Sequence, residues 1–235
     1  MISAPATARE PDVLTGTIHG WPRTLLMKTV SAFLRPLIGL EVWGVEHVPP
    51  EGPLIVVSNH LSNADPPLVS IAFPRPLFFM GKAELFRNPL LGFLVKLFGG
   101  FPVQRGTADR AAIRHALKVL NQGQAVGIFP EGGRSRTAAL APGFPGVGLI
   151  ALQARVPVIP VAITGTEYFP VNGDRPPKRP KGIPSRVTVT FGETFTVPER
   201  VDGRRVTPEE ATRLLMVRVA ELLPEQYRGV YSSDT

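Results

Sequence analysis

The chain has 235 residues, 43% of them apolar, which is enough for one sizeable hydrophobic core. It carries 26 Lys and Arg against 19 Asp and Glu, and the net charge of +7 favours anionic partners such as phosphorylated molecules, lipid headgroups or nucleic acid. There is no cysteine, which excludes disulfides and thiolate chemistry and lets the chain work in a reducing compartment.

Residues 1–20 contain prolines and acids where a signal peptide would have a basic start and an apolar run, so we expect a polar N-terminal tail. No later stretch reaches the roughly 18 to 20 uninterrupted apolar residues of a membrane span. The longest apolar segments are interrupted by Lys28 and Arg35 near the start of the chain and by Arg87 and Lys96 later. The sequence therefore predicts a protein that does not cross a membrane but can lie on its surface.

Residues 21–39 are predicted to form an amphipathic helix. Their apolar residues recur with a period close to 3.6, and Lys28 and Arg35 fall on the opposite face. Pro36 is expected to kink or end this helix in its last turn. Such a stripe commonly faces a protein core, whereas Trp21 at one end and basic residues opposite the stripe also suit a helix that lies in a membrane interface.

Residues 40–235 are expected to form a single α/β domain, because short β-like runs alternate with helical ones. The predicted architecture is a mixed, mostly parallel sheet flanked by helices, with the amphipathic helix at its N-terminus. The expected strands are 41–45, 54–58, 77–80, 125–129, 158–163 and 187–191. The expected helices are 66–73, 89–98, 108–122, 144–154 and 208–223.

His60 and Asp65 are the first candidates for chemistry. They come directly after the strand predicted over 54–58, and α/β folds place their sites at such strand ends. A carboxylate beside a histidine fixes the tautomer of the imidazole and leaves the other ring nitrogen to take a proton. Residues five apart do not face each other on a helix, so the pair requires a turn, which Ser62 and Asn63 can supply.

Asp65 also has a purely structural interpretation. It stands before Pro66 and Pro67, where it would be a good helix N-cap. A single histidine five residues before an aspartate is a weak signal for catalysis. The alternative therefore stays open on these residues alone.

Three further blocks follow the His60–Asp65 block in order. They are GGFPVQR at 99–105, FPEGGRS at 129–135 and the proline-punctuated strand VPVIPV at 156–161. Together the four blocks resemble the glycerolipid acyltransferase family, which contains the 1-acylglycerol-3-phosphate and glycerol-3-phosphate O-acyltransferases. The resemblance covers about residues 40–195.

This resemblance implies a role for each block. His60 would be the base that activates an acceptor hydroxyl, with Asp65 as its partner. The implied substrate-binding residues are Arg105, Glu131, Gly132, Arg134 and Ser135 of these blocks, together with Lys82, which lies in a segment, GKAELF at 81–86, that resembles the family's K-x-E-L-F stretch. Among these, the arginines and the lysine would contact phosphate, while Glu131 and Gly132 would line the acceptor site. The fourth block would support the groove for the acyl donor.

The implied reaction moves a fatty acyl group from an acyl thioester to the hydroxyl of a lysophosphatidic-acid-like glycerolipid phosphate, in phospholipid synthesis. The co-substrate would be acyl-CoA or an acyl carrier protein (acyl-ACP), and no cofactor is expected. Such a transfer requires a base, which contributes roughly 10²–10⁴-fold, and a thiolate leaves without a strong acid. The four histidines are scattered at positions 19, 47, 60 and 115, so no metal site is expected.

Two departures from the family pattern leave the acceptor open. Gly133 stands where the family commonly has threonine, and Gln104 stands where a second basic residue is frequent. The acceptor could therefore be another lysophospholipid, an aminolipid or a glycolipid, or the chain could be a non-catalytic lipid-binding member of the fold. Nucleic acid is not expected as a partner, because no nucleic-acid motif is present.

A lipid substrate favours the membrane interpretation of the 21–39 helix, with membrane lipids as partners and a peripheral location on the cytoplasmic face of the cell membrane. Residues 85–101 are apolar on nearly all faces and predict either a buried helix or an acyl-chain route that dips into the membrane. The 170–186 loop carries five basic residues against one acid, which suits either a solvated loop or an anionic leaflet.

Overall fold

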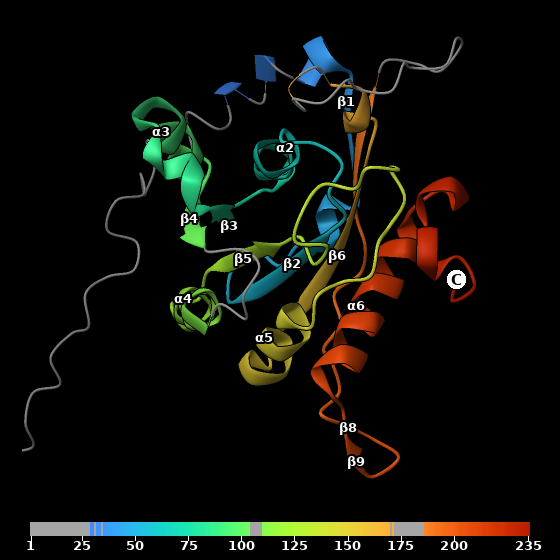
Figure 1. Cartoon of the computed structure of the whole chain (residues 1–235). Coiled ribbons are helices and arrows are strands. Elements are labelled where there is room, and N and C mark those ends of the chain that lie inside the picture. Colours follow the sequence, from blue (N-terminus) through green and yellow to red (C-terminus); the bar gives the residue numbers. More distant parts are fainter. Residues whose placement is uncertain (1–28, 31, 34, 104–109, 170, 172–185) are drawn as a thin grey trace, which may run out of the picture.

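The computed structural model of the chain describes residues 29–30, 32–33, 35–103, 110–169, 171 and 186–235. Seven strands form one sheet in the order β1-β7-β6-β2-β5-β3-β4 (Figure 1). Their bounds are β1 Leu40–Trp43, β2 Leu54–Ser58, β3 Leu77–Lys82, β4 Gly100–Val103, β5 Ala125–Ile128, β6 Val158–Thr164 and β7 Val187–Phe191. The helices are α2 Asp65–Ala72, α3 Pro89–Leu97, α4 Arg110–Asn121, α5 Gly146–Ala154 and α6 Pro208–Leu222. A small hairpin joins β8 Arg200–Val201 to β9 Arg204–Arg205.

The sheet is mixed and mostly parallel, which confirms the predicted fold class. Only the β6–β7 pair of this sheet is antiparallel, and the other five pairs are parallel. The central strand β2 pairs with β5 on one side and β6 on the other, and all five of its residues are buried. A strand buried on both faces reads as a continuous apolar run, which is why its bounds could be predicted to the residue.

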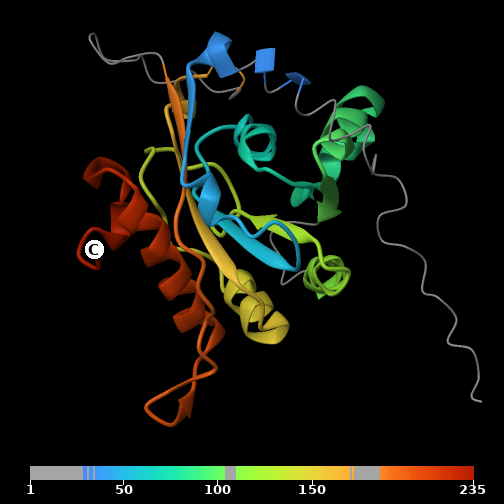
Figure 2. The same cartoon turned by 180° about the vertical axis from the view of Figure 1, so that it is seen from behind.

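Two hydrophobic clusters cover the two faces of the sheet. Ile55 and Val57 of β2 point to one face, where they pack with buried residues of α4, α5 and α6. Leu54 and Val56 point to the other face, where they pack with α2. Figure 2, which shows the molecule from behind, makes the same division visible. Side chains of β2 alternate between the two faces of the sheet, so the strand packs against a layer of helices on each face.

The predicted elements and the observed ones agree closely over most of the described chain. The strand predictions 54–58 and 187–191 match β2 and β7 to the residue, and all five predicted helices from residue 66 onward are present. The prediction missed β4, because Gly100 and Pro102 lower its β propensity, and it missed the short β8–β9 hairpin. The predicted tail over 1–20 lies outside the described residues.

The predicted N-terminal helix is described only in its last part, where residues 29–30, 32–33 and 35–38 are helical. Its apolar stripe divides: Val30 and Ile38 pack against the cluster that contains α2, whereas Phe33 and Leu37 are 75% and 79% exposed. Across the described ranges we find no helix with both the length and the hydropathy needed to cross a membrane. The basic loop 170–186 lies almost wholly outside these ranges.

The α5–α6 contact depends on a glycine that lets the two helices approach closely. A Cβ on Gly148 would run into the carbonyl oxygen of Pro208 and lie 2.6 Å from Thr212 Oγ1. The N–H of Gly148 also donates to Thr212 Oγ1, at 3.1 Å. Gly146, two residues earlier in the same helix, faces open space, so it provides a matched control for the same substitution.

We expect Gly148→Ala to lower the free energy of unfolding by about 1–3 kcal/mol, because the added methyl must push α6 away. Gly146→Ala should change it by no more than about 1 kcal/mol and in the stabilising direction. Urea denaturation followed by circular dichroism measures both. Equal effects of the two substitutions would show that the close approach of α5 and α6 contributes nothing.

Candidate active site

The candidate site lies where three neighbouring strands end. β2, β5 and β6 are adjacent and parallel, so their carboxyl ends meet at one edge of the sheet. His60 follows β2 by two residues, Glu131 follows β5 by three, and Thr166 follows β6 by two. The topology therefore brings together residues more than 100 positions apart in the sequence, at the edge where parallel α/β sheets bind their ligands.

The carboxylate of Asp65 is completely buried and accepts four hydrogen bonds. Its Oδ2 accepts from His60 Nδ1 at 2.9 Å and from the main-chain N–H groups of Leu61 and Ser62 at 2.6 and 2.7 Å. Its Oδ1 accepts from Thr166 Oγ1 at 2.6 Å. A buried charge needs such partners, and here they stabilise the ionised form where no water reaches it.

The bond from Nδ1 to Asp65 fixes the tautomer of His60. A carboxylate accepts, so Nδ1 carries the proton and Nε2 is the nitrogen with a free lone pair. The imidazole also stacks on the ring of Phe129, with 4.4 Å between centroids, and Phe129 stacks in turn on Phe79 at 5.5 Å. His60 is only 5% exposed, so its ring is held in one orientation with Nε2 ready to accept a proton.

The turn predicted between His60 and Asp65 is confirmed. Asp65 N–H donates to Ser62 O at 3.0 Å, and residues 63–64 form the turn before α2. The alternative of Asp65 as a helix N-cap is wrong, because Ala64 takes that position and Asp65 is the first helical residue. The side chain of Asp65 caps the preceding loop instead. Asn59 adds a second anchor by exchanging two 2.8 Å hydrogen bonds with the main chain of Ile163 in β6.

The FPEGGRS block contacts the main chain of His60. Glu131 Oε1 accepts from His60 N–H at 3.0 Å, and Ser135 N–H donates to His60 O at 2.7 Å. The hydroxyl of Ser135 turns back on its own loop, where it donates to Ala139 O at 2.7 Å. Gly132 has a φ of +65° and closes a turn onto Phe129 O, a left-handed conformation that favours glycine.

The remaining predicted site residues are described in part. Arg134 is partly exposed in the same loop. Lys82 is the last residue of β3, but its side chain lies outside the described part of the structure. Arg105 lies outside it entirely, two residues after β4 ends at Val103. The structure thus brings His60, Asp65, Glu131 and Ser135 together, while the phosphate contacts expected of Lys82, Arg105 and Arg134 remain predictions.

Two residues that contact the pair were missed by the sequence analysis. Thr166 is 101 positions from Asp65, and no local pattern links them. Phe129 was noted only as the first residue of a block, although its ring supports the imidazole. The one signal available for Thr166 was its place three residues beyond the strand predicted over 158–163; in the structure it follows β6 by two residues, as His60 follows β2.

The electrostatics of Glu131 differ from those of an ordinary surface carboxylate. Burial raises the pKa of Glu131 to about 7 from the usual 4.5. The N–H groups of Ala141 and His60 oppose this rise, and the negative charge of Asp65 adds to it. Among the described residues, no cluster of histidine and acidic side chains is suited to hold a metal ion.

The raised pKa of Glu131 predicts a pH-dependent stability. Between pH 4.5 and 7 the unfolded chain has ionised this group while the folded chain keeps its proton, so stability falls as the pH rises. Relative to Glu131→Gln, the wild type should lose up to about 3 kcal/mol of unfolding free energy across this window. Urea denaturation from pH 4 to 8 measures the difference. Two parallel stability curves would contradict a raised pKa of Glu131.

Comparison with known proteins extends these observations. The Acyltransferase family model matches residues 39–164. A 1-acyl-sn-glycerol-3-phosphate acyltransferase of Bacillus subtilis (strain 168) is 30% identical over 128 residues, which is 54% of this chain and 63% of that protein. One from Streptococcus pneumoniae (strain ATCC BAA-255 / R6) is 28% identical over 181 residues, or 71% of this chain and 63% of that protein. The chain thus spans less than two thirds of the length of these relatives.

The fold also matches a solved structure. The crystal structure of the 1-acyl-sn-glycerophosphate (LPA) acyltransferase PlsC from Thermotoga maritima has a TM-score of 0.62 at 24% identity, covering 85% of this chain and 80% of that one. The family match covers more than half of this chain and includes His60, Asp65 and the FPEGGRS block. The chain therefore belongs to the Acyltransferase family.

Proposed function

We propose that the chain is an O-acyltransferase that moves a fatty acyl group from a thioester to the hydroxyl of lysophosphatidic acid. The single observation that carries this proposal is the buried pair of His60 and Asp65, 2.9 Å apart, in which only Nε2 of the imidazole is left to accept a proton. The names of the relatives from Bacillus subtilis and Streptococcus pneumoniae support lysophosphatidic acid as the acceptor.

That geometry supports the following course of reaction. The acceptor hydroxyl attacks the thioester carbonyl carbon while Nε2 of His60 takes its proton, and Asp65 stabilises the imidazolium that forms. The carbon–sulfur bond then breaks, and the thiolate leaves and takes up the proton from the imidazolium, which restores the neutral base. We assign the phosphate of the acceptor to Arg105, Arg134 and Lys82, because guanidinium groups bind phosphate in bidentate geometry and an ammonium adds charge.

A different acceptor has one observation in its favour. A Cβ on Gly133 would have no heavy atom within 4 Å, so the FPEGGRS loop leaves open space where the family commonly carries a threonine. This space suits a bulkier lysophospholipid, an aminolipid or a glycolipid. Arg105→Ala separates the two candidates, because activity should fall only on phosphate-bearing acceptors if the arginine binds phosphate.

We expect His60→Ala to lower acceptor-dependent release of free thiol from acyl-CoA by roughly 10²–10⁴-fold, because the acceptor hydroxyl loses its base. Asp65→Asn should cause a loss of similar size, since the amide no longer fixes the tautomer of the imidazole. His47→Ala is the matched control, because His47 bonds to Phe191 O on a different part of the sheet and should leave the rate unchanged.

The assay also tests the proposal as a whole. Acyl-CoA and acyl-ACP are each offered with lysophosphatidic acid, other lysophospholipids and glycerol-3-phosphate, and the products are identified by mass spectrometry. A wild-type protein that releases no thiol with any acceptor would overturn the proposed reaction. Full activity of His60→Ala would show that the pair is not the catalytic centre.

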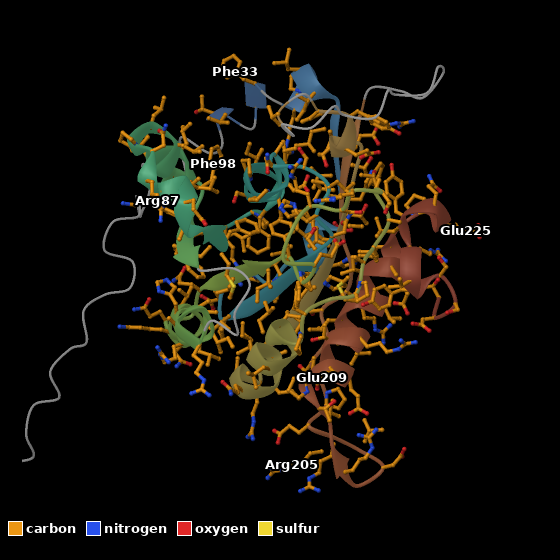
Figure 3. The ribbon with its side chains drawn as sticks, viewed as in Figure 1. Phe33, Arg87, Phe98, Arg205, Glu209 and Glu225 are labelled. Carbon is orange, nitrogen blue, oxygen red and sulfur yellow. The ribbon has the colours of Figure 1, made fainter. Side chains whose placement is uncertain are left out.

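We further propose that the protein lies peripherally on the cytoplasmic face of the membrane. Four apolar side chains of α3 are exposed to solvent, namely Leu90, Leu91, Phe93 and Leu94, with Leu90 at 70%. Arg87 and Lys96 beside them are exposed as well, which suits anionic headgroups. Figure 3 shows Phe33 at the same end of the molecule as Arg87, with Arg205 at the opposite end. Exposed apolar area of this extent supports docking on lipid.

We expect the double substitution of Leu90 and Phe93 by glutamate to reduce binding to vesicles of phosphatidylglycerol and phosphatidylcholine by at least tenfold, because two apolar side chains leave the bilayer. Val201→Glu is the control, since Val201 is also exposed but lies in the hairpin at the opposite end of the molecule. Vesicle co-sedimentation measures the binding. Equal loss in both proteins would contradict docking through α3.

A further inference from the structure

We propose that Glu131 is a positioning residue for His60 rather than a contact to the acceptor. Its carboxylate joins the main-chain N–H of His60 to that of Ala141 and so fixes the loop that carries the base. This inference rests on the proposed function only in taking His60 as the base.

The main chain of His60 is held on both sides by one loop. Oε1 of Glu131 accepts from His60 N–H at 3.0 Å, while Ser135 N–H donates to His60 O at 2.7 Å. The stacked ring of Phe129 comes from the start of the same loop. The loop thus fixes both the backbone and the ring plane of His60. The hydrogen bond from Nδ1 to Asp65 then fixes the direction in which the ring points within that plane.

The other end of the carboxylate is anchored in rigid structure. Oε2 of Glu131 accepts from Ala141 N–H at 3.1 Å. The neighbouring Leu140 is buried, its N–H donates to Tyr227 O at 2.9 Å, and its carbonyl accepts from Val230 N–H at 3.3 Å. The C-terminal turns therefore hold the far side of the loop, and Glu131 transmits this constraint to His60.

The charge of Glu131 also argues against a contact with a phosphate-bearing acceptor. A carboxylate that faces a lipid phosphate would repel the phosphate. Two N–H groups, in contrast, stabilise the carboxylate. Both oxygens already have such donors. The raised pKa, about 7, shows that burial outweighs these bonds, so the group holds its proton up to about pH 7 and carries its charge above that pH at a loss of stability.

Glu131→Gln is the sharp test, because glutamine keeps the shape but replaces one acceptor oxygen with a donor. The structure requires two acceptors, so one N–H must lose its partner. We expect kcat to fall by roughly 10- to 100-fold with KM for the acceptor unchanged, because a slightly displaced base acts equally on every bound acceptor. Glu209→Gln, an exposed change on α6, is the matched control and should leave both constants unaltered.

A second measurement does not depend on activity. In NMR spectra of the wild type, the main-chain amides of His60 and Ala141 should shift together with a midpoint near pH 7, since both donate to the same carboxylate. Asp65 and the ring of His60 are the other titratable groups beside this loop, so the Ala141 amide, which contacts neither in a hydrogen bond, is the cleaner reporter. The shared shift should disappear in Glu131→Gln.

The outcomes separate the two proposals. A raised acceptor KM with unchanged kcat in Glu131→Gln would overturn the positioning role and restore the acceptor contact. Independent titration of the two amides would overturn it as well, even if the variant fails to fold, because that measurement uses the wild type. A shared titration in a protein without acyl transfer would support the positioning role of Glu131 and overturn the proposed reaction alone.

Discussion

The structure of the site depends on how one buried negative charge is stabilised. Asp65 is inaccessible to water, so its ionised form requires hydrogen bonds from the protein, and it has four of them. Three of the donors come from residues 60–62 and the fourth from Thr166 at the end of β6. The chain after β2 must therefore wrap around the carboxylate, and this wrapping places the imidazole of His60 at the edge of the sheet.

The sheet supplies the fixed frame for this arrangement. Because β2 lies between β5 and β6, the segments that follow all three strands converge at one edge. β5 leads to the loop that holds the main chain of His60, and β6 leads to Thr166, which holds Asp65 from the other side. Buried strands belong to the most stable part of a fold, so the base and its partner rest on rigid elements.

The strands and helices could be predicted because the burial of their side chains produces a recognisable pattern of apolar residues in the sequence. The apolar run of β2, which ends at Ser58, and the alternation of β7 allowed their bounds to be predicted to the residue. The His60–Asp65 turn was predictable too, since only a turn brings residues five apart together. Thr166 was not, because its contact with Asp65 spans 101 positions and depends on strand order. β4 was missed because its glycine and proline lower the β propensity, and they are tolerated here because β4 is an edge strand, paired with β3 on one side.

The role of Glu131 could not have been predicted from its block, because its partners are main-chain N–H groups that any residue provides. The choice of glutamate at this place follows from hydrogen-bond capacity. An amide side chain offers one acceptor atom and one donor atom, whereas a carboxylate offers two acceptors of equal strength. Two N–H groups that face each other across a loop can be satisfied together only by the carboxylate. The raised pKa is the physical consequence, since burial disfavours the charged form of the group more than the two N–H groups favour it. The same residue loosens the loop when it gains a proton, because a protonated carboxyl group no longer accepts equally at both oxygens.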